Sequence, residues 1–95
     1  MKKYLLLHVG FTKPTDEIMK AWQAWFRSIE KRQIDQGGLG RAREVSRTGS
    51  RELASGMESL TGYNIIEAES LDEAEKIDKA CPAIASVRVY EIRSM

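Results

Sequence analysis

Residues 61–93, TGYNIIEAESLDEAEKIDKACPAIASVRVYEIR, decide the fold, because a strand, a helix and a second strand follow one another there with clear boundaries. Residues 61–68 are rich in residues that favour β-structure. Ser70 and Glu73 then form the Ser-x-x-Glu pattern that caps a helix N-terminus, and a Cys-Pro pair ends that helix. Residues 86–93 alternate Val with Arg and Tyr, as a strand does. The stretch therefore predicts a β-α-β unit.

The N-terminal part of the chain also predicts a strand followed by a helix. Residues 3–10, KYLLLHVG, form the first predicted strand, and their apolar side chains lie on both parities. A strand with this pattern is covered on both faces and is therefore central in its sheet. Residues 15–35 are predicted as one long helix, with Thr15 as N-cap and two acidic residues in the first turn. Gly37 stops that helix.

The middle of the chain, residues 37–60, is the least regular part. We expect a short strand at 43–47 and a turn at Gly49 and Ser50. Residues 51–60 are predicted as a loop, and some extended structure within it stays open. The predicted order is then β-α-β-β-α-β. This is the ferredoxin-like arrangement, an α+β fold with a four-stranded antiparallel sheet and both helices on one face.

One domain, residues 1–95, accounts for the whole length. The first and third predicted strands carry apolar residues on both parities, so the sheet face without helices also needs a cover. A second subunit is the natural cover for such a short chain. We therefore expect a homodimer whose sheets pack face to face.

Composition excludes several classes of protein. The chain is 42% hydrophobic and 31% charged, which is ordinary for a globular domain. Its net charge is +1, from 15 basic and 14 acidic residues, which argues against a nucleic-acid binder and against a polybasic membrane anchor. The apolar run near the N-terminus is a strand rather than a signal peptide, and we expect no membrane span. A single cysteine excludes an internal disulfide and favours a cytoplasmic location.

Metal and cofactor sites are not expected. Zinc needs three or four ligands, and the chain offers one histidine and one cysteine. Cys81 lies on the apolar stripe of the second helix, where it is interpreted as a small buried hydrophobe. The glycines and arginines of residues 37–60 match neither the dinucleotide nor the Walker pattern, and a solvated loop is preferred over an anion site. Trp22, Trp25 and Phe26 are interpreted as core, with one tryptophan at the mouth of the cleft as the alternative.

His8 is the only histidine and the first candidate for chemistry. It shares its strand parity with Tyr4 and Leu6, whereas Leu5, Leu7 and Val9 share the other. We expect the aliphatic parity to face the helices and His8 to face the cleft between the two sheets. Imidazole titrates near neutral pH, so a cleft histidine can act as acid or base. We interpret His8 first as a partly buried, hydrogen-bonded side chain; contact with a ligand and acid–base catalysis stay open.

Four more polar residues could join His8 in that cleft. Tyr63 and Glu67 share one side of the third predicted strand, and Arg88 and Tyr90 share one side of the last. Together with His8 they could hold a small polar or aromatic ligand. They could equally form a polar dimer seam with an Arg–Glu pair across it, and the sequence leaves both alternatives open.

The chain resembles the YCII-related family, which includes the DGPF-type proteins. The resemblance rests on KKYLLLHVG, on LTGYNIIEAESLDEAEKIDKACP and on SVRVYEI, and it spans nearly the whole chain. It implies a dimeric α+β barrel. Some members are thought to be enzymes with a His–Asp pair in the cleft, by likeness to muconolactone isomerases. This chain departs from that pattern: the first helix has no histidine, and the place of the Asp-Gly-Pro-Phe motif, residues 50–53, holds no aspartate.

Three hypotheses follow for the function. The first is a homodimer that binds a small molecule. The second is an enzyme of isomerase or lyase type that acts on a small cyclic or aromatic metabolite, with His8 transferring a proton and Arg88 or Tyr90 orienting the substrate. The third is a structural or partner-binding dimer. The sequence names no ligand for any of them.

Overall fold

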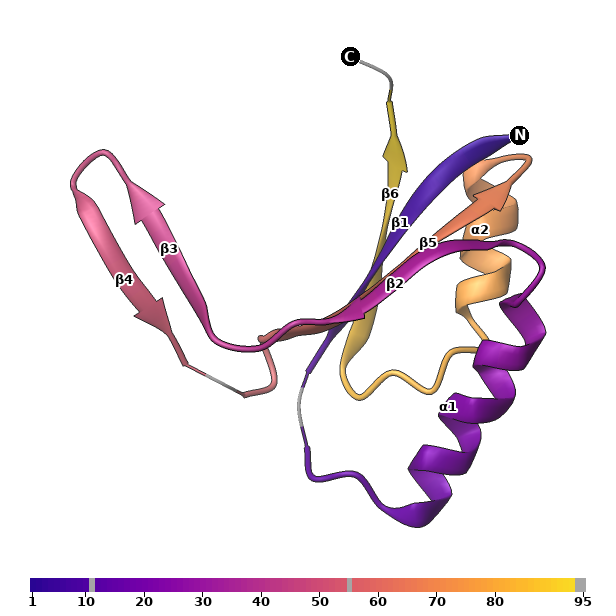
Figure 1. Ribbon diagram of the computed structural model, residues 1–95, viewed down its shortest axis with the longest axis horizontal. Helices are drawn as coiled ribbons and strands as arrows, with labels where there is room; N and C mark the ends of the chain where they lie inside the picture. Colours follow the sequence, from indigo (N-terminus) through magenta and orange to yellow (C-terminus); the bar gives the residue numbers. More distant parts are fainter. Residues whose placement is uncertain (11, 55, 94–95) are drawn as a thin grey trace.

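The computed structural model describes residues 1–10, 12–54 and 56–93 of the chain (Figure 1). The elements in chain order are β1 (Lys2–Val9), α1 (Asp16–Ile29), β2 (Gln33–Gly38), β3 (Ala42–Ser46), β4 (Gly49–Leu53), β5 (Leu60–Ala68), α2 (Leu71–Asp78) and β6 (Ser86–Ile92). Four of the strands form an antiparallel sheet in the order β2-β5-β1-β6. This confirms the predicted ferredoxin-like fold, with β1 and β5 at the centre of the sheet.

Both helices cover the same face of the sheet (Figure 1). The core between the sheet and the helices consists of Tyr4, Leu6, Trp25, Ile29, Ile66, Ala68 and Ala74. The indole N–H of Trp25 donates to the Ile77 carbonyl oxygen at 3.2 Å and so joins α1 to α2. We call the covered side of the sheet the helix face. The opposite side, the open face, carries Leu5, Leu7, Tyr63, Ile65, Glu67, Arg88 and Tyr90.

The helix N-termini form where the local sequence places them. The Thr15 hydroxyl accepts from the Ile18 N–H at 3.2 Å, and the Ser70 hydroxyl accepts from the Glu73 N–H at 3.1 Å. Each bond satisfies one of the N–H groups that a helix start leaves without a partner inside the helix. Both predicted caps are confirmed.

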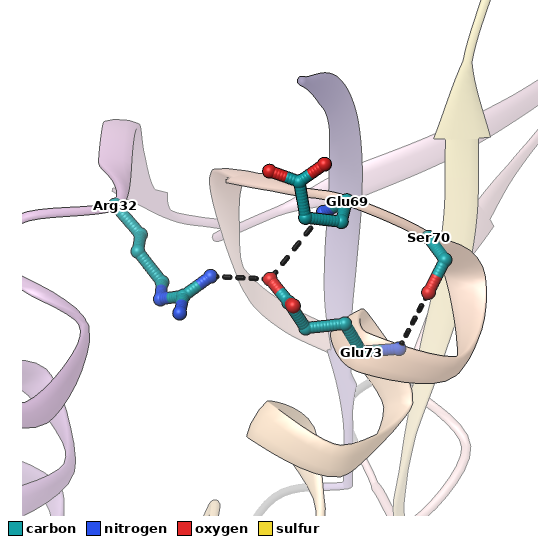
Figure 2. Close-up of polar contacts among 4 residues, drawn as sticks. All are labelled: Arg32, Glu69, Ser70 and Glu73. Atoms are coloured by element: carbon teal, nitrogen blue, oxygen red, sulfur yellow. Dashed lines mark hydrogen bonds and ion pairs between the residues drawn. The ribbon is translucent and has the colours of Figure 1, made fainter.

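The Glu73 carboxylate connects three segments of the chain (Figure 2). It accepts from the Glu69 backbone N–H at 3.3 Å and pairs with the Arg32 guanidinium at 2.5 Å. The Arg32 hydrogen bond is the main reason that the pKa of Glu73 lies below its usual value, and the Glu69 N–H adds to it. Arg32 directly precedes β2, so this contact ties the beginning of the edge strand to the beginning of α2 (Figure 2).

The prediction of one helix over residues 15–35 is wrong at its C-terminal end. The helix α1 ends at Ile29, and residues 33–38 form the edge strand β2. No glycine or proline lies between Thr15 and Gly37, so the local sequence gave no stop signal. The strand forms because its backbone pairs with β5, which is a contact between segments distant in sequence.

The predicted strand at 43–47 exists, as β3, but it is not part of the main sheet. It pairs with β4 in a separate two-stranded hairpin, with its turn at residues 47 and 48 rather than at Gly49 and Ser50. In the segment 51–60, predicted as a loop with extended structure left open, residues 51–53 belong to β4 and Leu60 begins β5; residue 55 lies outside the described residues. We call residues 42–53 the arm.

The predicted orientation of the first strand is also wrong. Tyr4 and Leu6 lie in the core beneath the helices, and His8 shares their side of the strand. Leu5 and Leu7 point instead to the open face, where they remain partly exposed. The prediction from residue type therefore assigned the two faces of β1 the wrong way round, although it grouped the alternating side chains correctly.

Within the described residues, no helix is both long and apolar enough to cross a membrane.

Candidate functional site

A cavity of about 530 Å³ opens between the helix face and the N-terminal half of α1. Its lining residues are His8, Val9, Gly10, Thr12, Pro14, Ile18, Trp22, Phe26, Gln36, Gly37, Gly38, Thr61, Gly62, Tyr63, Asn64 and Ile84. The volume falls within the usual range of small-molecule sites, about 300–1,000 Å³. The walls combine apolar and aromatic side chains from α1 with polar groups from the sheet.

Aromatic rings form one wall of the cavity, and His8 lies against them. The imidazole meets the Trp22 ring edge-on, with centroids 5.0 Å apart, and the Trp25 ring edge-on at 5.7 Å. Phe26 lies 5.6 Å from Trp22 and continues the wall toward solvent. Trp25 is buried in the core, as the sequence predicted, whereas Trp22 and Phe26 also line the cavity. The wall suits a flat, apolar ligand surface.

His8 belongs to a chain of polar side chains that crosses the site. Its Nε2 lies 2.6 Å from Asn64 Oδ1, which can only accept, so Nε2 carries the proton. The Asn64 amide in turn donates to Gln33 Oε1 at 2.7 Å. On the other side of the ring, the Cys81 thiol lies 3.7 Å from Nδ1, and in the neutral imidazole that nitrogen accepts. Cys81, His8 and Asn64 thus each donate to the next member of the chain.

Burial lowers the pKa of His8, and the Asn64 hydrogen bond opposes this only in part. The side chain is 6% exposed. At neutral pH His8 is therefore a neutral imidazole with both nitrogens engaged by protein groups. It offers a ligand its ring surface rather than a free base.

Glycines give the cavity part of its shape. At Gly37 a Cβ atom would lie 2.6 Å from Cε1 of Tyr63, so only glycine lets that ring lie across the strand. Gly10 has φ +105°, a conformation open to glycine, and a Cβ there would lie 3.0 Å from Ala85. At Gly38, in contrast, no atom of the described residues lies within 4 Å of where a Cβ would stand. A side chain at Gly38 would therefore occupy space at the cavity.

The structure does not bring the predicted site residues together. Arg88 and Tyr90 pair with Leu7 and Leu5 of β1, and Glu67 pairs with Lys3, so all three lie on the open face, away from His8. Tyr63 also has open-face parity; it borders the cavity, and its hydroxyl donates to Asp35 at 3.3 Å. The predicted convergence on His8 is therefore wrong within one subunit for Glu67, Arg88 and Tyr90, because strand alternation places them on the other side of the sheet. Tyr63 and His8 do line the same cavity.

Asn64, Gln33 and Gln36 were missed by the sequence argument. Asn64 is 1% exposed and directly holds His8. A signal was present: Asn64 shares the parity of Ile66 and Ala68, and a polar residue on the apolar side of a strand needs a partner. The two glutamines gave no such signal, because they fell in the segment predicted as helix or loop.

A second cavity of about 540 Å³ lies between α2 and β6 and is lined by Asp78, Cys81 and Val87 among others. Burial raises the pKa of Asp78 to about 7, and its Oδ1 has no hydrogen-bond partner among the described residues. Burial likewise raises the pKa of the Cys81 thiol to about 12, so this thiol is unreactive at neutral pH. Among the described residues no cluster of three or more His, Cys, Asp or Glu side chains could hold a metal ion.

No protein-family model matches the sequence, and no curated protein matches it. Among solved structures, the chain is similar to 5-chloro-2-hydroxyhydroquinone dehydrochlorinase (TftG) from Burkholderia phenoliruptrix, in complex with 2,5-dihydroxybenzoquinone. That match has a TM-score of 0.60 and 17% identity, and it covers 96% of this chain and 93% of the other. The 30S ribosomal protein S6 from Thermotoga maritima matches with a TM-score of 0.47 and 12% identity, over 96% and 87% of the two chains. At 17% identity the first match shows a shared fold.

Proposed function

We propose that this chain is a homodimeric protein that binds a small, flat aromatic or quinone-like molecule in the cavity beside His8. The observation that carries the proposal is the wall of Trp22 and Phe26 facing a buried, neutral imidazole. Aromatic walls favour a planar apolar ring, and the amides of Gln36 and Asn64 could bond oxygen atoms on its rim. The quinone bound by the dehydrochlorinase of similar fold supports the choice of ligand class.

Binding is preferred over catalysis because of the state of His8. A general base must have a free nitrogen within hydrogen-bond reach of the proton that it removes. Here Nε2 donates to Asn64 and Nδ1 faces the Cys81 thiol. The neutral imidazole keeps acid–base chemistry as the second candidate function. For that chemistry the weak Cys81 contact, at 3.7 Å, would have to give way to the substrate.

The homodimer is proposed from the open face. Leu5, Leu7 and Ile65 lie there partly exposed, and Tyr90 is 51% exposed on the edge strand. A second copy packed on this face would bury these side chains. Tyr63, Glu67, Arg88 and Tyr90 would then lie at a polar seam between subunits, the alternative to a ligand site already drawn from the sequence. This arrangement agrees with the resemblance to the YCII-related family. For the location of the protein, the single free cysteine supports the cytoplasm.

Ligand binding can be tested with a cavity-blocking variant and a matched control. Gly38→Leu fills space at the cavity, whereas Gly40→Leu places the same side chain in open space at a residue that does not line it. Thermal unfolding and tryptophan fluorescence would be followed during titration with 2,5-dihydroxybenzoquinone, simple phenols and a saturated cyclohexanediol. We expect the flat rings to stabilise wild type and Gly40→Leu, by about 2.7 kcal/mol at a hundredfold excess over Kd. Gly38→Leu should bind at least about tenfold more weakly.

The proposal fails if no flat aromatic stabilises the wild type, or if Gly38→Leu binds as well as Gly40→Leu. Mass spectrometry of the titrated protein should show no covalent adduct on Cys81, which separates binding from thiol addition to a quinone. Turnover of a probe that is abolished in His8→Gln, with binding retained, would move the assignment to the enzyme hypothesis. Sedimentation gives a separate answer on the dimer: a particle of 10.8 kDa at micromolar concentration would refute it.

A further inference from the structure

The arm, residues 42–53, is the part of the molecule that the proposed site does not use. Each residue of β3 and β4 is exposed, and Val45 is 77% exposed. In the part of the chain that the structure describes, no sheet ladder joins the arm to the other four strands. The radius of gyration is 14.4 Å, compared with about 12 Å for a compact chain of this length. The arm is therefore an extension that stands clear of the core.

Such an arm has little to stabilise it within one subunit. A lone two-stranded hairpin is marginal in water, because it buries almost no apolar surface. The ion pairs Arg41–Glu52 and Arg51–Glu44 hold its strands together, but their side chains are largely exposed, and exposed pairs contribute little. Val45 and Leu53 have opposite parities and so form no joint apolar face. The arm therefore needs a second surface.

A matching surface exists on the same chain, at the free edge of β6. This strand ends the sheet order β2-β5-β1-β6, so one side of its backbone has no ladder in the described residues. Its sequence, SVRVYEI, contains no proline or glycine to block a further strand. Tyr90 and Ile92 are exposed along it. An edge of this kind is a ready acceptor for an added strand.

Within the described residues, the arm forms no sheet ladder with β6 of its own subunit. It follows β2, at one edge of the sheet, and β6 is at the other edge, three strand spacings or about 14 Å away across the sheet. In Figure 1 the arm rises on the side of the sheet opposite to the helices, which is the side of the open face. A second copy packed on that face brings its own β6 toward the arm.

We infer that the arm is an exchange arm that adds to the free edge of β6 in a second copy of this chain. The inference rests on the homodimer of the proposed function and specifies how its subunits hold each other. In a two-fold pair each arm reaches the other subunit, so both arms and both β6 edges gain partners and the assembly closes.

The experiment uses paired cysteines in a Cys81→Ser background. Val45→Cys is made in one sample and Tyr90→Cys in a second, and the two are mixed under mild oxidation. We expect a crosslinked species of twice the 10.8 kDa subunit mass, at a yield at least about tenfold above a control mixture. The control mixture replaces Tyr90→Cys by Lys31→Cys, an exposed residue after α1 on the helix side.

A second variant replaces residues 42–53 by a short Asn-Gly turn, which should leave the core folded because the arm lies outside it. Sedimentation should then show at least about a tenfold weaker dimer. A monomeric wild type overturns both the proposed homodimer and the proposed exchange of arms. A wild-type dimer that is unchanged without the arm, and that gives no Val45–Tyr90 crosslink, overturns the arm alone. Assembly that grows beyond two subunits with concentration overturns the closed exchange.

Discussion

The two faces of the central sheet both carry apolar side chains, but polar side chains are buried on one face and exposed on the other. On the helix face, His8 and Asn64 are buried and bonded to each other. On the open face, Arg88 and Tyr90 are exposed. The difference shows that a polar residue in a strand does not identify the solvent side. What matters is whether the covering layer supplies a partner, because an unpaired buried polar group is costly.

The largest test of this comparison is a pair of leucine truncations. Leu6→Ala, on the helix face, removes a fully buried side chain, 0% exposed, and should reduce the free energy of unfolding by about 2–5 kcal/mol. Leu5→Ala, on the open face, should cost about 1 kcal/mol in the monomer. Denaturant titrations at low and high protein concentration measure both. If a second copy covers the open face, the loss of unfolding free energy caused by Leu5→Ala should increase with protein concentration. An equal loss for the two variants in the monomer would contradict the assignment of faces.

The second prediction concerns Asp78, a buried polar residue of α2. Its pKa is raised from 3.8 to about 7 by burial, so between these values the folded protein binds a proton that the unfolded protein has released. Stability therefore falls as pH rises from about 4 to 7. Asp78→Asn should remove that loss and raise the free energy of unfolding at pH 8 by on the order of 2–3 kcal/mol. The control is Asp72→Asn in the exposed first turn of the same helix, and an identical pH profile for both variants would contradict the prediction.

Asn64→Leu tests the buried polar chain. The substitution leaves the His8 Nε2–H and the Gln33 amide oxygen without their bonds, so it should cost about 1–3 kcal/mol although it adds apolar surface. The matched change on the open face, Glu67→Gln, should stay within about 0.5 kcal/mol. Urea denaturation compares the two. A neutral Asn64→Leu would mean that the polar chain contributes nothing to stability.

The smallest effect is a spectroscopic one. In the wild type, burial holds the pKa of His8 below 6.5, so its stabilising neutral form is lost only as pH falls through that lowered value. Asn64→Asp places a carboxylate next to Nε2 and should raise the pKa of His8. NMR titration of the imidazole protons gives both values, and an unchanged or lower pKa in the variant would show that Asn64 does not hold the ring.

Local signals in the sequence predicted the parts of the fold that depend on local chemistry. The helix starts at Thr15 and Ser70 follow from hydroxyl caps, and the strands β1, β5 and β6 were predicted from their residue types and periodicity. The end of α1 could not be predicted, because residues 33–38 become a strand only by pairing with β5. The prediction of which sheet face carries His8 was wrong for a similar reason. The indoles of Trp22 and Trp25 and the amide of Asn64, which lie far from His8 in sequence, make burial of a histidine possible.

The Tyr63 ring over Gly37 has a consequence for folding accuracy. The edge strand β2 begins with an irregular register against β5, between Gln33 and Asp35, so its pairing alone could slip by a residue. A slip by one would place Gln36 or Gly38 under the ring and turn each side chain of the strand to the other face. Gln36 would meet the ring with a side chain where a bare Cβ already has no room. The contact between Gly37 and Tyr63 thus disfavours the register that would place Gln36 under the ring. In the observed register Gln36 lines the cavity together with Gly37 and Gly38.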